Sequence, residues 1–290
     1  MLYKLYVIGF YLTRTLPIRA CYWIADAAAY SYYIFSKKDR HCLADNLKMV
    51  LMEKADKRTI NKHIRGVFRN FARYLADFFK FSKLTPECFN KKIEVVGIHN
   101  LDKCLSGGKG AITLSPHLGN WELGAAIIAA HGYPVTAVVL EHKDKRVDDF
   151  FTQQRSINNL KVVPLGIQLR QCFTVLKDNG VLAIAGDKDY TSSGEFVDFF
   201  GKGTAMPKGA AVFSLKTGAP IVVCACVRKK NDEFQLSFEE PIVPEQTGDY
   251  QKDLHNLMER YISIFERVIR KYPDQWYAFQ EIWKQEPATQ

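Results

Sequence analysis

The chain has 290 residues, of which 47% are hydrophobic and 24% are charged, and this balance excludes an intrinsically disordered protein. The formal charge of +9 favours an anionic partner, which could be nucleic acid, anionic lipid or an acidic protein, although excess Lys and Arg also occur simply to keep a surface soluble. The seven cysteines are scattered, without the spacing of a zinc site or a disulfide framework, which favours a reducing compartment.

The first 35 residues form two apolar, aromatic stretches. Within residues 1–12 the only charged residue is Lys4. Arg14 and Arg19 follow this stretch, and residues 20–35 are again mostly apolar. Neither stretch supplies the ~20 mostly apolar residues that a spanning helix needs, although a spanning anchor stays open. A secretory signal is not indicated, because a strongly basic start and a small-residue cleavage site are missing.

Tyr and Trp interleaved with a few basic residues are typical of a membrane interface. We therefore expect residues 1–45 to form a helical, membrane-associating segment. Two ordinary core helices are the alternative.

Residues 46–290 are predicted to form one α/β domain. A first long helix is indicated by apolar residues on one helical face between Ile64 and Phe79. Strands alternate with helices after it, which favours a mostly parallel central sheet with helices on both faces. The predicted strands are 111–115, 134–140, 160–164, 180–186, 219–227 and 234–239. The predicted helices are 121–131, 147–158, 167–178 and 207–217, with a last amphipathic helix that ends before Pro273.

The stretch SPHLGNWELGAA, residues 115–126, lies at a predicted strand-to-helix turn. Asn120 suits an N-cap, and Glu122 then falls in the first turn, where the helix dipole favours a carboxylate. His117 is therefore an exposed turn residue at the carboxyl end of a strand, where open α/β sheets bind ligands. A carboxylate that folds back onto His117 would hold the imidazole in one tautomer, as a general base requires.

The same residues also allow other roles for His117. A helical metal pair uses a spacing of three or four, whereas His117 and Glu122 are five apart and no third ligand stands nearby. A satisfied loop histidine is the commoner case for a lone His. No G-x-S-x-G elbow is present, so a general base here would take its proton from a substrate hydroxyl.

These residues resemble the H-x4-D/E signature of the lysophospholipid acyltransferase superfamily. The Glu at the second position is similar to the late acyltransferases of bacterial lipid A biosynthesis, whereas the glycerophosphate branch reads N-H-x4-D, from which Pro116 and Glu122 depart. The resemblance covers nearly the whole chain in the right order. It extends to Leu16–Pro17, Asp45–Leu47, Gly186–Tyr190, Val197–Gly201, Met206–Gly209, Lys216–Pro220 and Tyr272–Trp276.

The resemblance implies transfer of a fatty acyl group from a thioester to a lipid hydroxyl, without a metal or a bound cofactor. His117 would be the general base and Glu122 would orient it. Arg155 would stabilise the oxyanion, with Arg170 as the fallback, and Asp187 would hold the arginine. The alternative for Arg155 and Arg170 is that each lies on a solvated helix face, and for Asp187 that it only forms a turn. Lys188 receives no catalytic role.

Further residues are expected to bind substrate. Phe199 and Phe200 would line the acyl pocket, although core packing is the commoner role for at least one of them. Pro207 and Gly209 would start a helix and allow close backbone approach. The full substrate-binding set is Asn120, Trp121, Arg170, Phe199, Phe200, Gly201, Pro207 and Gly209.

The implied partners are an acyl carrier protein, or acyl-coenzyme A, as donor and an anionic membrane lipid as acceptor, with no nucleic acid. A lipid A precursor is the favoured acceptor, and phosphatidylinositol mannoside and lysophospholipid stay open. The implied location is the cytoplasmic face of a bacterial inner membrane, peripheral or held by a single N-terminal anchor. An acyl-thioester hydrolase and a non-catalytic lipid-binding protein are the two alternative functions.

Overall fold

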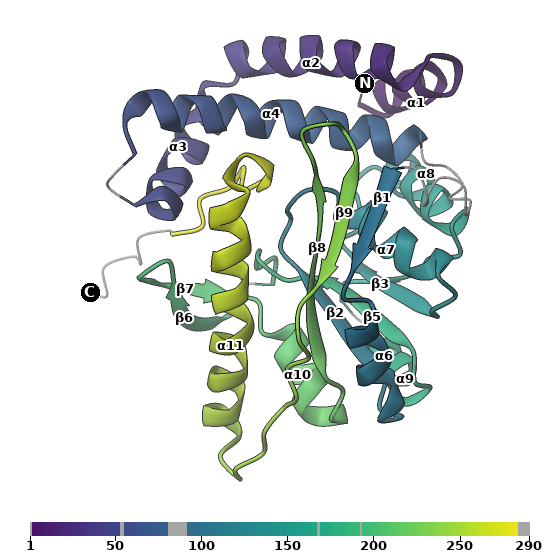
Figure 1. The fold of residues 1–290 in the computed structure, drawn as a ribbon, viewed down its shortest axis with the longest axis vertical. Coiled ribbons are helices and arrows are strands. Elements are labelled where there is room, and N and C mark those ends of the chain that lie inside the picture. Colours follow the sequence, from purple (N-terminus) through teal and green to yellow (C-terminus); the bar gives the residue numbers. More distant parts are fainter. Residues whose placement is uncertain (1, 53–54, 81–91, 167–168, 192, 284–290) are drawn as a thin grey trace.

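A seven-stranded sheet forms the centre of the computed structural model, which describes residues 2–52, 55–80, 92–166, 169–191 and 193–283 (Figure 1). The strand order is β1-β9-β8-β2-β5-β3-β4. Neighbouring strands are parallel except β8 and β9, so β1 and β9 run against the other five. The strands are β1 Ile93–Val96, β2 Ala111–Ser115, β3 Val135–Val139, β4 Lys161–Pro164, β5 Val181–Ala185, β8 Ile221–Arg228 and β9 Phe234–Phe238.

Helices cover both faces of this sheet, as expected from the alternating pattern. Helices α6 and α7 share one buried cluster with the sheet, which includes Leu101 and Ile127. Helices α9, α10 and α11 share the other, which includes Leu176, Leu215 and Phe265. The bounds are α6 His99–Ser106, α7 Trp121–Ala130, α8 Lys145–Ser156, α9 Arg170–Lys177, α10 Gly209–Thr217 and α11 Tyr250–Lys271.

The predicted strands are confirmed within two residues, because strands buried on both faces appear as continuous apolar runs. The predicted start of the helix at 167–168 lies outside the described residues. The sequence pattern missed β1, α6 and a separate antiparallel pair, β6 Glu195–Phe199 and β7 Lys202–Met206.

Among the residues that the structure describes before β1, the long helices are α1 Leu2–Thr15, α2 Ile18–Phe35, α3 Lys37–Leu51 and α4 Lys57–Lys80. Helix α4 runs across one end of the sheet, and α1 and α2 lie on its outer side (Figure 1). In the described ranges, every helix is too short or too polar to cross a membrane. The N-terminal segment is thus helical as expected, and its docking on a membrane stays a prediction.

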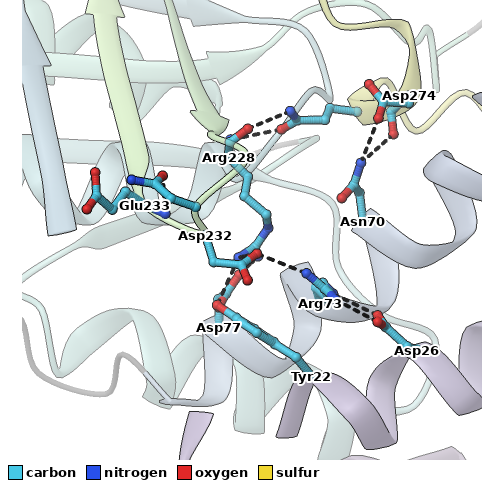
Figure 2. Close-up of polar contacts among 11 residues, drawn as sticks. Tyr22, Asp26, Asn70, Arg73, Asp77, Arg228, Asp232, Glu233 and Asp274 are labelled. Carbon is cyan, nitrogen blue, oxygen red and sulfur yellow. Dashed lines mark hydrogen bonds and ion pairs between the residues drawn. The ribbon is translucent and has the colours of Figure 1, made fainter. Parts of the chain in front are cut away.

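A buried polar network ties α2 and α4 to the sheet (Figure 2). The Tyr22 hydroxyl donates to Asp77 at 2.6 Å, and Asp77 forms an ion pair with Arg228 at the end of β8. Arg228 also donates to the Tyr22 hydroxyl at 2.8 Å. Arg73 of α4 bridges Asp26 of α2 and Asp232 of the β8–β9 turn, at 2.6 and 2.9 Å. Helix α2 therefore packs on the body of the protein through charged as well as apolar groups.

Candidate active site

The turn between β2 and α7 holds His117 in place through its backbone. Gly119 has φ +64°, and a Cβ there would overlap the carbonyl oxygen of Cys226, so only glycine fits. The Asn120 backbone N–H donates to the same carbonyl at 2.7 Å. Its side-chain oxygen accepts from the Leu123 N–H at 3.0 Å, which confirms the predicted N-cap of α7.

A buried carboxylate orients the His117 ring, and it belongs to Asp187. Nδ1 of His117 lies 2.5 Å from Oδ1 of Asp187, which also accepts the His117 backbone N–H at 2.9 Å. Oδ2 accepts from the indole N–H of Trp276 at 2.8 Å. An ionised carboxylate is only an acceptor, so Nδ1 carries the ring proton and Nε2 is left as the basic nitrogen.

The Asp187 carboxylate is strongly biased towards its charged form. Burial alone would raise its pKa, but the charge of His117, the hydrogen bonds from His117 and Trp276, and the charge of Lys188 outweigh burial and lower the pKa to about 2. A carboxyl group whose pKa is lower in the folded state stabilises the fold at pH values above its unfolded-state pKa. That stabilisation is lost as the pH falls through the folded-state pKa. Asp187 therefore stays ionised at any pH near neutrality.

Glu122 has a different partner from the one expected. Its carboxylate accepts from Nε and a terminal nitrogen of Arg155, at 3.0 and 2.6 Å, and both side chains are about nine-tenths buried. Burial would lower the pKa of Arg155, but the charge of Glu122 raises it. The expected pairs, Glu122 with His117 and Asp187 with Arg155, are thus exchanged.

Strand register explains the exchange. In the parallel pair β2 and β5, Ser115 lies opposite Ala185. Two residues further along, His117 and Asp187 therefore emerge side by side from the same edge of the sheet. Glu122 lies on the first turn of α7, where its carboxylate reaches α8 and Arg155 instead.

A cavity of about 380 Å³ adjoins the His117 ring. Its walls come from the carboxyl halves of β2, β3 and β5, from α7, and from Phe71, Tyr74 and Leu75 of α4. Trp121 closes one side of the cavity. Its ring stacks on that of Tyr74, with the ring centroids 4.6 Å apart, and lies edge-on to the His117 ring, with the centroids 5.1 Å apart. The lining is mostly apolar with a few convergent polar groups, which is typical of a small-molecule site.

Two cations line this cavity, Arg155 and Lys188. The Lys188 ammonium donates to the backbone carbonyl of Tyr277 at 2.9 Å. Burial lowers the pKa of Lys188, against the opposing effect of Asp187. Within the described residues, no three His, Cys, Asp or Glu side chains gather as metal ligands would.

Several predicted substrate-binding residues lie away from the cavity. Phe199 is fully buried in the core and stacks on Trp283 at 5.6 Å, and Phe200 packs beside it, so neither lines the cavity. Phe199 points into the core because it lies on the inward face of β6. Arg170 is exposed at the start of α9 and is not a lining residue.

Gly201, Pro207 and Gly209 likewise do not line the cavity, and the Pro207 carbonyl accepts from the Tyr261 hydroxyl at 3.4 Å. Gly201 has φ +79° in the β6–β7 turn, where its N–H donates to Asp198 at 2.8 Å. Gly209 begins α10 as predicted, but nothing approaches it closely, because a Cβ there would meet no atom within 4 Å.

The structure adds site residues that sequence reasoning did not assign. Trp276 holds Asp187, and the Tyr277 N–H donates to the His117 carbonyl at 2.9 Å. The resemblance had marked the Tyr272–Trp276 segment, but without a role. Lys188 lies in the Gly186–Tyr190 segment of the resemblance, where it was given no catalytic role. Tyr74 carried no such signal, because an aromatic residue on an amphipathic helix is a common feature.

Comparison with known proteins identifies the family of this chain. The family described as bacterial lipid A biosynthesis acyltransferase matches residues 1–285 of the chain. A phosphatidylinositol mannoside acyltransferase of Mycolicibacterium smegmatis is 28% identical over 224 residues, which are 76% of this chain and 72% of that protein. The protein of the same name in Mycobacterium tuberculosis is 28% identical over 222 residues, covering 74% and 68%. The family match spans almost the whole chain, so this protein is an acyl-transferring enzyme that belongs to the bacterial lipid A biosynthesis acyltransferases.

Proposed function

We propose that the protein transfers a fatty acyl group from a thioester to a hydroxyl of an anionic glycolipid, with His117 as general base. The observation that carries the proposal is the buried Asp187 carboxylate, which binds Nδ1 of His117 and leaves Nε2 basic beside an apolar cavity. A hydroxyl cannot attack a thioester until a base removes its proton, and an oriented imidazole does this at neutral pH.

The reaction follows from these positions. Nε2 of His117 takes the hydroxyl proton while the oxygen forms a bond to the thioester carbonyl carbon. The carbonyl electron pair moves onto its oxygen, and the cations of the cavity wall, Arg155 and Lys188, stabilise that oxyanion. When the intermediate collapses, the carbon–sulfur bond breaks and the thiolate receives the proton from His117. The mechanism uses only side chains of this chain and the two substrates.

The proposed donor is an acyl carrier protein, and the proposed acceptor is a lipid A precursor or a phosphatidylinositol mannoside. The family description supports the first acceptor and the names of the two relatives support the second. Both are anionic glycolipids, in keeping with the net charge of +9.

Thiol release from an acyl carrier protein is expected to require an added glycolipid acceptor. The value of kcat/KM for the carrier should fall several-fold from low to physiological salt, because steering between opposite charges is screened. It should exceed the value for acyl-coenzyme A at both salt concentrations. Acceptor-independent release would identify a hydrolase, and the absence of turnover in both conditions would identify a lipid-binding protein.

The cavity is proposed to hold the acyl chain. Its lining follows α7 from Trp121 through Gly124 and Ala125 to Ile128, away from His117. The seven helical steps from Trp121 to Ile128 span about 10 Å, and the small side chains of Ala137 and Ala183 line the cavity with them. The acyl chain of the donor would therefore lie between α7 and the sheet.

Ala125→Leu is expected to shift the preference towards shorter acyl donors. A buried methylene contributes about 0.8 kcal/mol, so excluding two of them would weaken use of a long donor about tenfold. Competition between donors of different length, read by mass spectrometry of the product, measures this. Ala130→Leu is the matched control, because Ala130 is exposed on the same helix and does not line the cavity. An unchanged chain-length profile in Ala125→Leu would place the acyl chain elsewhere.

The proposed location is the cytoplasmic face of the inner membrane. We define the apolar face as the exposed side chains Leu5, Ile8, Tyr11 and Leu12 of α1 and Trp23, Ile24, Tyr30, Ile34 and Phe35 of α2. Trp23 and Phe35 are 79% and 83% exposed. Contact between such an apolar face and water is unfavourable, whereas aromatic and aliphatic side chains are stable at a bilayer interface.

Trp23→Ser combined with Phe35→Ser is expected to weaken binding to phosphatidylcholine vesicles at least tenfold. Each aromatic side chain would bury about 150–250 Å² on insertion into the bilayer, and the variant loses the free energy of that burial. Vesicle flotation measures the bound fraction. Phe196→Ser with Tyr250→Ser removes two exposed aromatics outside α1 and α2 and serves as the control. Equal flotation of the first variant and the wild type would refute docking through the apolar face.

A further inference from the structure

A second, strongly basic hollow lies outside the catalytic cavity. We name it the basic groove, with a volume of about 1430 Å³ between α2, α4 and the end of α11. Its cations are Lys57, Arg58, Lys62, Arg65 and Arg69 of α4, Lys230 of the β8–β9 turn and Lys271 at the end of α11. The carboxylates that line it, within the described part of the chain, are Asp26 and Asp274.

The cations of the groove lack counter-charges. Among the described residues, none of the seven forms an ion pair with a carboxylate. Asp26 is already paired with Arg73, and Asp274 accepts hydrogen bonds from Asn70 (Figure 2). The sole acid of α4, Asp77, is buried on Arg228.

Helix stability does not explain this arrangement. Arg58, Lys62, Arg65 and Arg69 follow one another at spacings of three and four, where like charges repel on a helix. The start of α4 is a different case, because the Asp56 carboxylate accepts the Thr59 N–H at 2.8 Å and already places an anion at the helix N-terminus. A bound anion would relieve the repulsion along the stripe, so the stripe is better explained by a ligand than by the fold.

We propose that the basic groove binds anionic phospholipid headgroups of the membrane on which the apolar face lies. Tyr30 connects the two surfaces, because it is 64% exposed, belongs to the apolar face and also lines the groove. A helix lying in the interface would bring the flanking cations of α4 to the level of the phosphates. The proposal rests on the membrane docking proposed above and adds a requirement for lipid charge.

An acidic carrier protein fits this groove less well. The groove and the catalytic cavity share no lining residue. Phe71, Tyr74 and Leu75 of α4 line the cavity, whereas the basic stripe lies on the opposite side of the helix. A carrier that delivers its thioester to His117 must seat at the cavity rather than behind α4.

The test compares two triple variants of the full chain. Arg58→Gln, Lys62→Gln and Arg69→Gln removes three exposed cations from the groove. Lys177→Gln, Lys216→Gln and Lys252→Gln removes the same charge from exposed positions on α9, α10 and α11, outside the groove. Flotation is measured with vesicles of phosphatidylcholine alone and of phosphatidylcholine mixed with phosphatidylglycerol.

The groove variant is expected to lose about a hundredfold in binding to the anionic vesicles, because each of the three cations near such a surface contributes about fivefold. Its binding to neutral vesicles should equal that of the wild type, and the control variant should keep anionic binding within a few-fold. Arg58→Lys with Arg69→Lys keeps the charge and should keep the binding. Glycerol 3-phosphate at constant ionic strength should not release the protein.

Several results would overturn the proposal. The groove variant could bind anionic vesicles as tightly as the wild type does, or the control variant could lose as much binding as the groove variant. Release of the protein by glycerol 3-phosphate would assign the groove to a free phosphate compound. Intact vesicle binding with a reduced kcat/KM for acyl carrier protein would assign it to the carrier instead. Loss of neutral-vesicle binding in the Trp23 and Phe35 variant tests the apolar face alone, so failure of one surface is distinguishable from failure of the other.

Discussion

His117→Ala is expected to lower turnover about 100- to 10,000-fold, the usual range for loss of a general base. The protein should still fold, because the turn is held by backbone contacts. Its thermal unfolding midpoint should fall, because the buried Asp187 carboxylate loses the His117 ring as a partner. His142→Ala is the matched control. His142 is a second histidine that lines the same cavity, and its loss should leave turnover within a few-fold.

Asp187→Asn should be nearly as damaging as His117→Ala. An amide can donate to Nδ1 and so favour the tautomer whose proton lies on Nε2, where no proton can then be accepted. Glu122→Gln should affect turnover less and stability more, because it leaves the Arg155 charge buried without its partner. Turnover above a tenth of wild type in His117→Ala, or in Asp187→Asn, would contradict the assigned chemistry.

Asp77→Ala is expected to lower the free energy of unfolding by about 3–5 kcal/mol, the range for removing one partner of a buried ion pair. Asp77 is fully buried and bonds both Arg228 and Tyr22, so the substitution strands a guanidinium in the interior (Figure 2). Denaturant unfolding measures the change. The effect should reach α2, because Tyr22 would lose its acceptor.

A double substitution separates stranded charge from lost packing. Asp77→Leu with Arg228→Met should destabilise much less than the sum of the two single changes, since no unpaired charge remains. Asp45→Ala, which breaks the exposed pair with Lys48, should change stability by about 0.5 kcal/mol or less and serves as the surface control. A change in Asp77→Ala as small as in Asp45→Ala would show that the buried pair does not hold the N-terminal helices.

Local patterns in the sequence were enough to predict the sheet and the turn that carries His117. Strands such as 111–115 and 181–185 are continuous apolar runs because both faces of the sheet are covered. The Asn120 cap and the place of Glu122 in the first turn of α7 depend on neighbours a few residues away. The H-x4-E pattern, together with the later segments, was enough to identify the family.

Contacts between residues distant in sequence were settled only by the tertiary structure. The partner of His117 depends on which strand lies beside β2, and the β2–β5 pairing brings Asp187 there from 70 residues away. Phe199 could have faced a ligand or the core, and its packing against Trp276 and Trp283 decided for the core. The basic groove likewise joins α4 to Lys230 and Lys271 from much later in the chain. Sequence periodicity reports which face of an element is buried, whereas packing decides what that face meets.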